Sequence, residues 1–346
     1  MNKVTRAAVI LCLFSGPVTA EDLDLNFDFR FRYEYTDDSG KADTRNRNRI
    51  RTRFGAKYSA SENLDLFVRF ATAEENTTSG NQTLGTGFTV SDIGMDQMYL
   101  KYDLSKNTDL LFGKMKNPFF KPNKSELIFD GDYNPKGLAF NLNFGDIFSN
   151  IGYIKFDENP LKTIDIKSLQ LGLNKNINDQ TKAKISFAIY DFDKVKAFSP
   201  NQITWNGKNF GNSIDDNGNY LYDFSLMNLS LEIKTKMMSL PTTFFLDIVN
   251  NSDADQNDRG FQSGLSLKIN EKWKLTYLFK DIESDSTFGA LTHSDFGGGG
   301  AGHKGHQLNL SYPITERFSV DVVWFDNKKK MITDYNKIFV DFKYKL

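Results

Sequence analysis

Residues 23–35 read LDLNFDFRFRYEY, and this run decides the fold. Apolar and aromatic residues occupy its odd positions, while charged residues and Asn occupy the even ones. A period of two is typical of a β-strand with one apolar and one polar face. Residues 337–346, at the other end of the chain, repeat the pattern. The sequence therefore predicts two strands of the same design near the two ends of the chain.

Comparable runs recur between these two segments and bring the number of predicted strands to sixteen. They lie at 23–35, 47–59, 64–73, 95–104, 108–116, 136–144, 147–156, 167–175, 182–190, 222–234, 242–249, 260–268, 272–280, 306–312, 318–325 and 337–346.

The connections between these strands alternate between short turns and long polar loops. The long ones fall at 36–46, 74–92, 117–135, 157–166, 191–221, 250–259, 281–305 and 326–336. A soluble β-sandwich has no reason to keep this order, whereas an outer-membrane barrel has short periplasmic turns and long outer loops. We therefore predict an all-β fold, a 16-stranded antiparallel transmembrane β-barrel with short periplasmic turns and long extracellular loops.

Residues 1–20 have the features of a secretory signal peptide. Two basic residues precede an apolar run at 7–14, and small residues at 18–20 form a cleavage site. The alternative, a buried N-terminal helix, is disfavoured because Pro17 would break it. We expect removal of 1–20, which leaves 21–346 as the barrel domain.

The composition excludes several classes of protein. The 43 Lys and Arg residues nearly balance 44 Asp and Glu, which argues against a nucleic-acid-binding protein. The 31 Phe and 14 Tyr residues are too many for a disordered chain. No apolar run reaches the length of about 18 residues that a membrane-spanning helix needs. A mean hydropathy of -0.47 still suits a membrane barrel, because only alternate strand residues face lipid.

A column of arginines marks the second predicted strand. They occupy alternate positions, at Arg45, Arg47, Arg49, Arg51 and Arg53. At about 3.4 Å per residue the column extends roughly 27 Å, close to the roughly 25 Å height of a barrel's apolar band. Facing lipid would cost about 2–4 kcal/mol for each Arg near the midplane. We therefore expect the column to face the lumen.

Further basic residues are expected to extend this wall on neighbouring strands. They are Arg30, Arg32, Arg69, Lys101, Lys114 and Lys116. The alternative is that the arginines merely pair with inward acids, such as Asp28 and Glu34, in a packed interior. Because sixteen strands enclose an aqueous channel, we favour a water-filled lumen.

The loop at 117–135 combines acidic residues with apolar ones. Its acids include Glu126, Asp130 and Asp132, and its apolar residues predict that it folds inward and packs. We expect it to narrow the pore and to set these acids across from the arginines, which would create a transverse field. In the alternative, the acids are simply solvated at the outer mouth.

Several blocks of the sequence resemble the putative porin family of Gram-negative outer membranes. They lie at 45–55, 96–102, 112–119, 127–132, 240–241, 244–247 and 302–306. The resemblance implies a trimeric or monomeric diffusion channel without a cofactor. The chain departs from the usual outer-membrane pattern by ending in Leu346 rather than Phe.

The histidines are the remaining chemical signal. His293, His303 and His306 all lie in or beside one outer loop, where His293 is followed by Ser294 and Asp295. Because no persuasive second element of a catalytic triad is present, we do not expect an enzyme. A metal pair from His303 and His306 is less favoured than a solvated glycine-rich loop, so we predict no metal site.

Together these features predict an outer-membrane porin for passive diffusion of small hydrophilic solutes and ions. The alternatives are a substrate-specific anion channel, a barrel enzyme, and an adhesin or phage receptor. The expected partners are outer-membrane lipid, lipopolysaccharide and small hydrophilic solutes, with a homotrimer left open and nucleic acid not expected.

Overall fold

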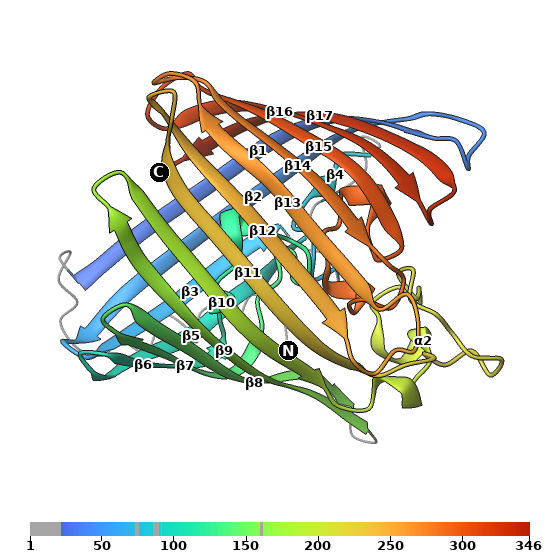
Figure 1. Ribbon diagram of the computed structural model, residues 1–346, viewed down its shortest axis with the longest axis horizontal. Coiled ribbons are helices and arrows are strands. Elements are labelled where there is room, and N and C mark those ends of the chain that lie inside the picture. Colours follow the sequence, from blue (N-terminus) through green and yellow to red (C-terminus); the bar gives the residue numbers. More distant parts are fainter. Residues whose placement is uncertain (1–21, 73–75, 86–89, 91, 160–161) are drawn as a thin grey trace.

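The computed structural model describes residues 22–72, 76–85, 90, 92–159 and 162–346. The predicted signal peptide at 1–20 lies outside the described residues. Within these ranges the chain forms one antiparallel sheet that closes on itself, because the last strand pairs with the first. Figure 1 shows the strands running obliquely around the resulting barrel.

Sixteen long strands form the wall of the barrel in the part of the chain that the structure describes. They are β1 (Leu23–Asp38), β2 (Arg45–Ser61), β3 (Leu64–Thr72), β5 (Ile93–Ser105), β6 (Thr108–Lys114), β7 (Lys136–Phe144), β8 (Ile147–Asn159), β9 (Lys162–Asn178), β10 (Thr181–Phe192), β11 (Phe224–Met237), β12 (Leu240–Asn251), β13 (Arg259–Lys268), β14 (Lys274–Ile282), β15 (His303–Pro313), β16 (Phe318–Lys329) and β17 (Thr333–Lys345). A two-residue strand, β4 (Gln82–Thr83), adds to the edge of β2. Each predicted strand overlaps one long strand, so the predicted fold class is confirmed.

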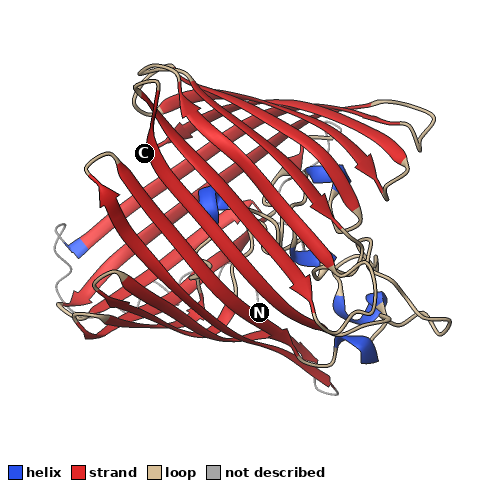
Figure 2. Ribbon diagram, viewed as in Figure 1, coloured by secondary structure: helices blue, strands red, loops and turns tan. Residues whose placement is uncertain are grey.

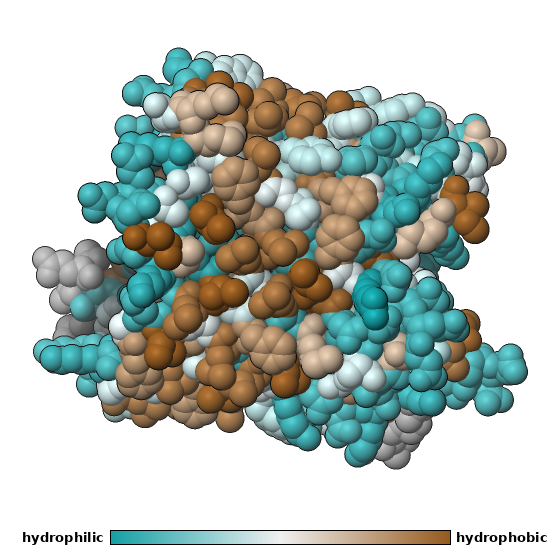
Figure 3. All heavy atoms as spheres, viewed as in Figure 1, coloured by the Kyte–Doolittle hydropathy of each residue, from teal (hydrophilic) through white to brown (hydrophobic). Residues whose placement is uncertain are grey.

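The register gives the two faces of the wall opposite character. On one face Arg30 opposes Arg51 and Arg32 opposes Arg49, while on the other Phe31 opposes Ile50. On the side of the barrel seen in Figure 3, apolar residues lie between two hydrophilic ends. Exposed apolar residues of the second face are Phe54, Leu100, Phe112, Phe140, Leu171, Phe187, Leu229, Phe244, Phe261, Trp324, Ile338 and Phe342. This apolar outer band is the surface that a barrel presents to lipid.

Several strands continue further toward the long-loop end than predicted. β9 begins at Lys162, and β16 and β17 continue until a turn at 330–332 joins them. The long loops predicted at 157–166 and 326–336 are therefore wrong for most of their length. Polar residues such as Lys328 and Asp334 pair in register here, and their polarity hid the strand in the sequence.

Three long connections place apolar side chains in the interior of the barrel: loops 115–135, 193–223 and 283–302. Part of loop 193–223 also extends beyond the strand ends (Figure 1). The three loops carry the short helical elements η2 (Pro122–Lys124), η3 (Val195–Ala197), α2 (Pro200–Ile203), η4 (Gly289–Leu291) and η5 (Phe296–Gly298), which lie within and at one end of the barrel in Figure 2. Along the described chain, no helix is both long enough and apolar enough to span a bilayer.

The three inner loops pack together against the inner face of β8–β12. Phe129 of loop 115–135, Phe198 of loop 193–223 and Phe288 of loop 283–302 belong to one buried cluster. Tyr190 of β10 meets Phe129 edge-on at 5.1 Å between ring centroids. The prediction that the apolar residues of 117–135 fold inward and pack is confirmed.

Candidate functional site

Two cavities adjoin on the side of the interior bounded by β1, β2 and β17. One of about 610 Å³ lies toward the long-loop end, and its lining includes Arg45 and Lys337. The other, of about 670 Å³, is lined by Arg30 and extends to Arg317 at a short turn. Both cavities are lined by Thr78, Ser294 and Asp295, so they meet at these residues.

The arginines of β2 all lie on the inner face of the wall, as the strand period requires. Each of them meets a carboxylate supplied by β1, β5 or loop 115–135. Arg47 forms an ion pair with Glu34, and Arg45 and Arg49 approach the same carboxylate at 3.7 and 3.5 Å. Glu34 is 0% exposed. Arg51 pairs with Asp28 at 2.6 Å.

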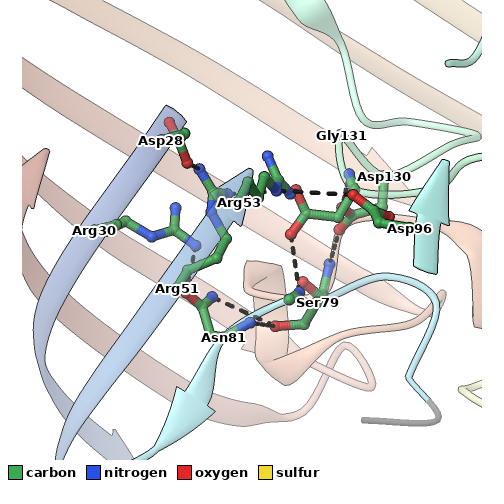
Figure 4. A network of polar contacts seen from close by, with 12 residues as sticks. Asp28, Arg30, Arg51, Arg53, Ser79, Asn81, Asp96, Asp130 and Gly131 are labelled. Atoms are coloured by element: carbon green, nitrogen blue, oxygen red, sulfur yellow. Dashed lines mark hydrogen bonds and ion pairs between the residues drawn. The ribbon is translucent and has the colours of Figure 1, made fainter. Parts of the chain in front are cut away.

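Loop 115–135 reaches this wall through a single carboxylate, that of Asp132. Its Oδ1 lies 2.6 Å from Arg53 and 3.5 Å from Arg51, and its Oδ2 accepts a hydrogen bond from the backbone N–H of Gly80 at 3.1 Å. Burial by itself would raise the pKa of Asp132, but Arg53 and Arg51 hold that pKa well below its usual value. Figure 4 shows Arg53 pointing toward this loop, while Arg51 points toward Asp28.

The other two predicted loop acids, Glu126 and Asp130, line the same cavity as Arg30, Arg32 and Arg51 without contacting them. Asp130 accepts hydrogen bonds from the backbone N–H groups of Asp132 and Ser294, both at 2.8 Å. Glu126 pairs with His293 at 3.0 Å. Through these contacts both acids bind loop 115–135 to loop 283–302.

The pKa values of these two acids differ in direction. Burial raises the pKa of Asp130, and the neighbouring charges of Glu126 and Asp132 raise it further. Burial would also raise the pKa of Glu126, but His293, Lys121 and Lys280 lower it to about 2. Glu126 is therefore ionised at neutral pH.

One acid that contacts the basic wall was not identified in the sequence. Asp295, in loop 283–302, pairs with Arg32 at 2.8 Å and with Lys337 of β17 at 2.6 Å. Burial would raise its pKa, but Lys337 and Arg32 hold that pKa well below the usual value. Apolar residues in this loop, such as Phe288 and Phe296, are the same signal that revealed the folding of 117–135.

Partners of Arg30 and Arg32 come from strands and loops distant in sequence. Arg32 donates two hydrogen bonds to Asp341 of β17, at 2.6 and 2.9 Å. Arg30 donates to Asn81, whose backbone carbonyl also accepts from Arg49 at 2.9 Å. Such pairs across the barrel closure cannot be found from local sequence patterns.

The remaining predicted basic residues divide into two groups. Arg69 pairs with Asp96 at 2.5 Å, and Lys101 lies between Asp103 and Asp109, 3.4 Å from the latter. Both lie in phase with the inner face.

Lys114 and Lys116 have different surroundings. Lys114 opposes Met98 in the register, and it lines a cavity of about 140 Å³ together with Arg53 and Asp132. Lys116 follows the end of β6 and is exposed. The predicted extension of the basic wall is therefore corrected for Lys116.

The expectation of a solvated loop around the histidines is wrong. His303 is 3% exposed, and its Nε2 lies 3.2 Å from the carbonyl oxygen of Gly299. Asp295 is occupied by Arg32 and Lys337, and Ser294 donates its backbone N–H to Asp130. Across the described residues, no group of three or more His, Cys, Asp or Glu side chains is placed to hold a metal ion.

Comparison with protein families decides the identity of the barrel. A family model described as "Putative porin" matches residues 39–223 and 219–336. The chain belongs to this porin family. Membership and the sixteen-stranded fold place the porin in the outer membrane as a transmembrane β-barrel, and they indicate a channel rather than an enzyme.

Solved structures show that the porin shares its fold with distant outer-membrane proteins. A high-pH structure of Pseudomonas putida OprB aligns with a TM-score of 0.65 at 10% identity, covering 99% of this chain and 96% of that one. A triple mutant of Rhodopseudomonas blastica porin aligns with a TM-score of 0.56 at 11% identity, covering 93% and 100%. A Vibrio cholerae OmpT variant with loop L8 deleted aligns with a TM-score of 0.53 at 12% identity, covering 94% and 100%. A search of curated proteins found no match.

Proposed function

We propose that this porin is a water-filled channel for passive diffusion of small hydrophilic solutes and ions, and that its passage follows the arginine column. The observation that carries the proposal is the pair of adjoining cavities, one toward each end of the barrel, which meet beside Asp295. Arg45, Arg47 and Arg49 of β2 line one cavity, and Arg30 and Arg32 of β1 with Arg51 of β2 line the other. The passage therefore has a basic wall along much of its length.

Fixed charges of both signs lie along the passage. Asp295, where the two cavities meet, contacts Arg32 and Lys337, and Asp132 of the second cavity contacts Arg51 and Arg53. Paired charges of this kind order water and dipolar solutes, and they distinguish ions by charge.

The surrounding pairs support a modest preference for anions. Glu34 serves three arginines and Lys337, so the column keeps more positive than negative charge near this acid. A substrate-specific anion channel is the second candidate, and the same excess of arginines favours it. Saturation of current with one particular anion would distinguish that candidate from open diffusion.

We further propose the setting in which the channel works. Residues 1–20 direct export and are removed, and residues 21–346 form the barrel. Outer-membrane lipid and lipopolysaccharide contact the apolar band, and a homotrimer would use part of that same surface. Crosslinking of the purified porin in detergent would test for the homotrimer.

Planar-bilayer recording tests the proposal. We expect a stable, linear current, and we expect the triple substitution R47Q, R49Q and R51Q to shift the reversal potential in a KCl gradient toward cations. The matched control is Lys101→Gln, which removes an inner-face cation that two aspartates already neutralise. An unchanged reversal potential in the triple variant would contradict the basic wall.

A further inference from the structure

A third cavity, of about 500 Å³, lies on the wall opposite the arginine column. It is enclosed by η2 of loop 115–135 and by the inner face of β9–β14, close to the short turns. Six lysines line it: Lys121, Lys124, Lys182, Lys184, Lys234 and Lys274. Glu232 is the one acidic residue among the lining residues. The Lys121 ammonium donates to the backbone carbonyls of Phe129 and Asp130 at 2.9 and 3.3 Å, which leaves five lysines against this one acid.

The lysines of this cavity repel each other in the folded barrel. Lys182 lies directly opposite Lys234 in the register of β10 and β11, and like charges in this position destabilise a sheet. Lys124 and Lys274 line the same cavity. The fold therefore holds several like charges close together at this wall.

Glu232 cannot neutralise the group, because its two carboxylate oxygens are already used. Oε1 lies 2.8 Å from Lys234, and Oε2 accepts a hydrogen bond from the backbone N–H of Asn123 at 2.6 Å. The arginine column differs, since its cations meet Glu34, Asp28, Asp96 and Asp132. The cavity therefore has an excess of cations that the fold itself does not satisfy.

One lysine contacts two aromatic rings. The Lys184 ammonium lies 4.3 Å from the ring centroid of Phe120 and 4.1 Å from that of Phe148. Cation–π contacts keep the charge of the ammonium and leave its N–H groups on the open side free to donate. Lys184 opposes Glu232 in the register, next to the Lys182–Lys234 pair.

We propose that this cavity is a binding site for a compact multivalent oxyanion of the pyrophosphate kind. Several ammonium groups on flexible stems can surround one anion, and charge-assisted hydrogen bonds to its oxygens would replace the repulsion between the lysines. A monovalent anion could not bridge the group in the same way. The site faces the short-turn end, so its ligand comes from the periplasmic side.

Isothermal titration calorimetry of the detergent-solubilised full barrel with pyrophosphate tests the site. The wild type is expected to bind saturably, and acetate at the same concentration is expected not to compete. The double variant Lys182→Gln and Lys234→Gln should bind about tenfold more weakly, because two charge-assisted contacts are lost. Lys101→Gln and Arg51→Gln, which remove inner-face cations elsewhere, should bind as the wild type does.

Three results would overturn the inference: no saturable binding by the wild type, equal binding by the double variant, or loss of binding in Arg51→Gln instead. Removing two repelling charges is expected to leave the barrel folded, and circular dichroism of the double variant checks this. The single variant Lys234→Gln provides a second measurement with a smaller expected loss.

The calorimetric test does not depend on conduction, whereas the effect on current rests on the proposed function. Pyrophosphate added on the short-turn side should reduce the wild-type current more than the current of the double variant. If the barrel conducts but does not bind pyrophosphate, the proposed site is wrong and the proposed channel stands. If it binds pyrophosphate but does not conduct, the proposed site stands and the proposed channel is wrong.

Discussion

The two halves of the barrel interior are filled by different kinds of side chain. Against β8–β12, the three inner loops pack aromatic and aliphatic side chains into a dry cluster that includes Phe129, Tyr190 and Phe288. Against β17, β1 and β2, charged side chains pair with each other and leave two adjoining cavities. Apolar packing closes space, whereas paired charges hold water beside them. The difference explains why a passage can exist on one side alone.

The largest expected effect comes from opening the apolar half. Phe129→Ala removes a ring that stacks with Tyr133 and meets Tyr190 edge-on, at 5.5 and 5.1 Å between centroids. Truncation of a buried Phe costs about 3–5 kcal/mol, which should detach loop 115–135 from the wall. We expect a larger and noisier single-channel conductance in bilayers.

The matched control for that change is Phe112→Ala on the outer face, where the ring is exposed. It should leave conductance unchanged. An unaltered conductance in Phe129→Ala would show that the packed half does not restrict the passage, which would break the comparison.

A smaller effect is expected from removing the acid at the centre of the charged half. Glu34→Gln leaves Arg45, Arg47, Arg49 and Lys337 without their shared carboxylate. Breaking a buried ion pair by removing one partner costs about 3–5 kcal/mol, part of which Gln recovers by hydrogen bonding. We expect a lower unfolding midpoint in guanidinium and a stronger preference for anions.

Glu316→Gln is the control, because Glu316 is exposed at a short turn. It should change neither the unfolding midpoint nor the ion preference by a measurable amount. If Glu34→Gln also left the unfolding midpoint and the ion preference unchanged, the arginines and Lys337 would not depend on the Glu34 carboxylate.

The smallest expected effect is a pH dependence of the contact between loops 115–135 and 283–302. Ionised Glu126 binds His293, and its pKa falls from 4.5 to about 2. A lowered folded-state pKa gives stability that is present above about 4.5 and is lost as the pH falls toward 2. We expect loop 283–302 to loosen over this interval, seen as acid-induced current noise.

Glu126→Gln should abolish that acid-dependent step and leave current at neutral pH nearly unchanged. If the variant kept the same step, another group would be responsible, and Asp130, whose pKa is raised, would be the first to examine by substitution with Asn.

Strand periodicity was enough to predict the wall but not the interior. The alternation seen in 23–35 recurs along the chain and placed all sixteen strands, and it put the arginine column on the inner face because each side chain's face follows from a period of two. The partners of the arginines could not be predicted, because Asp295 and Asp341 are brought to Arg32 by a folded loop and by closure of the barrel.

The same limit applies to loop 117–135. Its aromatic residues showed that it packs, since apolar side chains seek burial wherever the loop runs. Backbone turns in this loop decide which of its acids contacts Arg53. They place Asp132 against Arg53 on the barrel wall and turn Asp130 toward Ser294. Local sequence carries little information about such turns.

Chemical access to the arginine column tests the account most directly. Cys12, in the predicted signal peptide, is the sole cysteine of the sequence, so Arg49→Cys would give a single reactive thiol in the mature barrel. A water-soluble sulfonated thiol reagent should then reduce the current of Arg49→Cys in steps, while Phe54→Cys, on the outer band, keeps its current. If Arg49→Cys conducted but did not respond to the reagent, the passage would not run along the arginines.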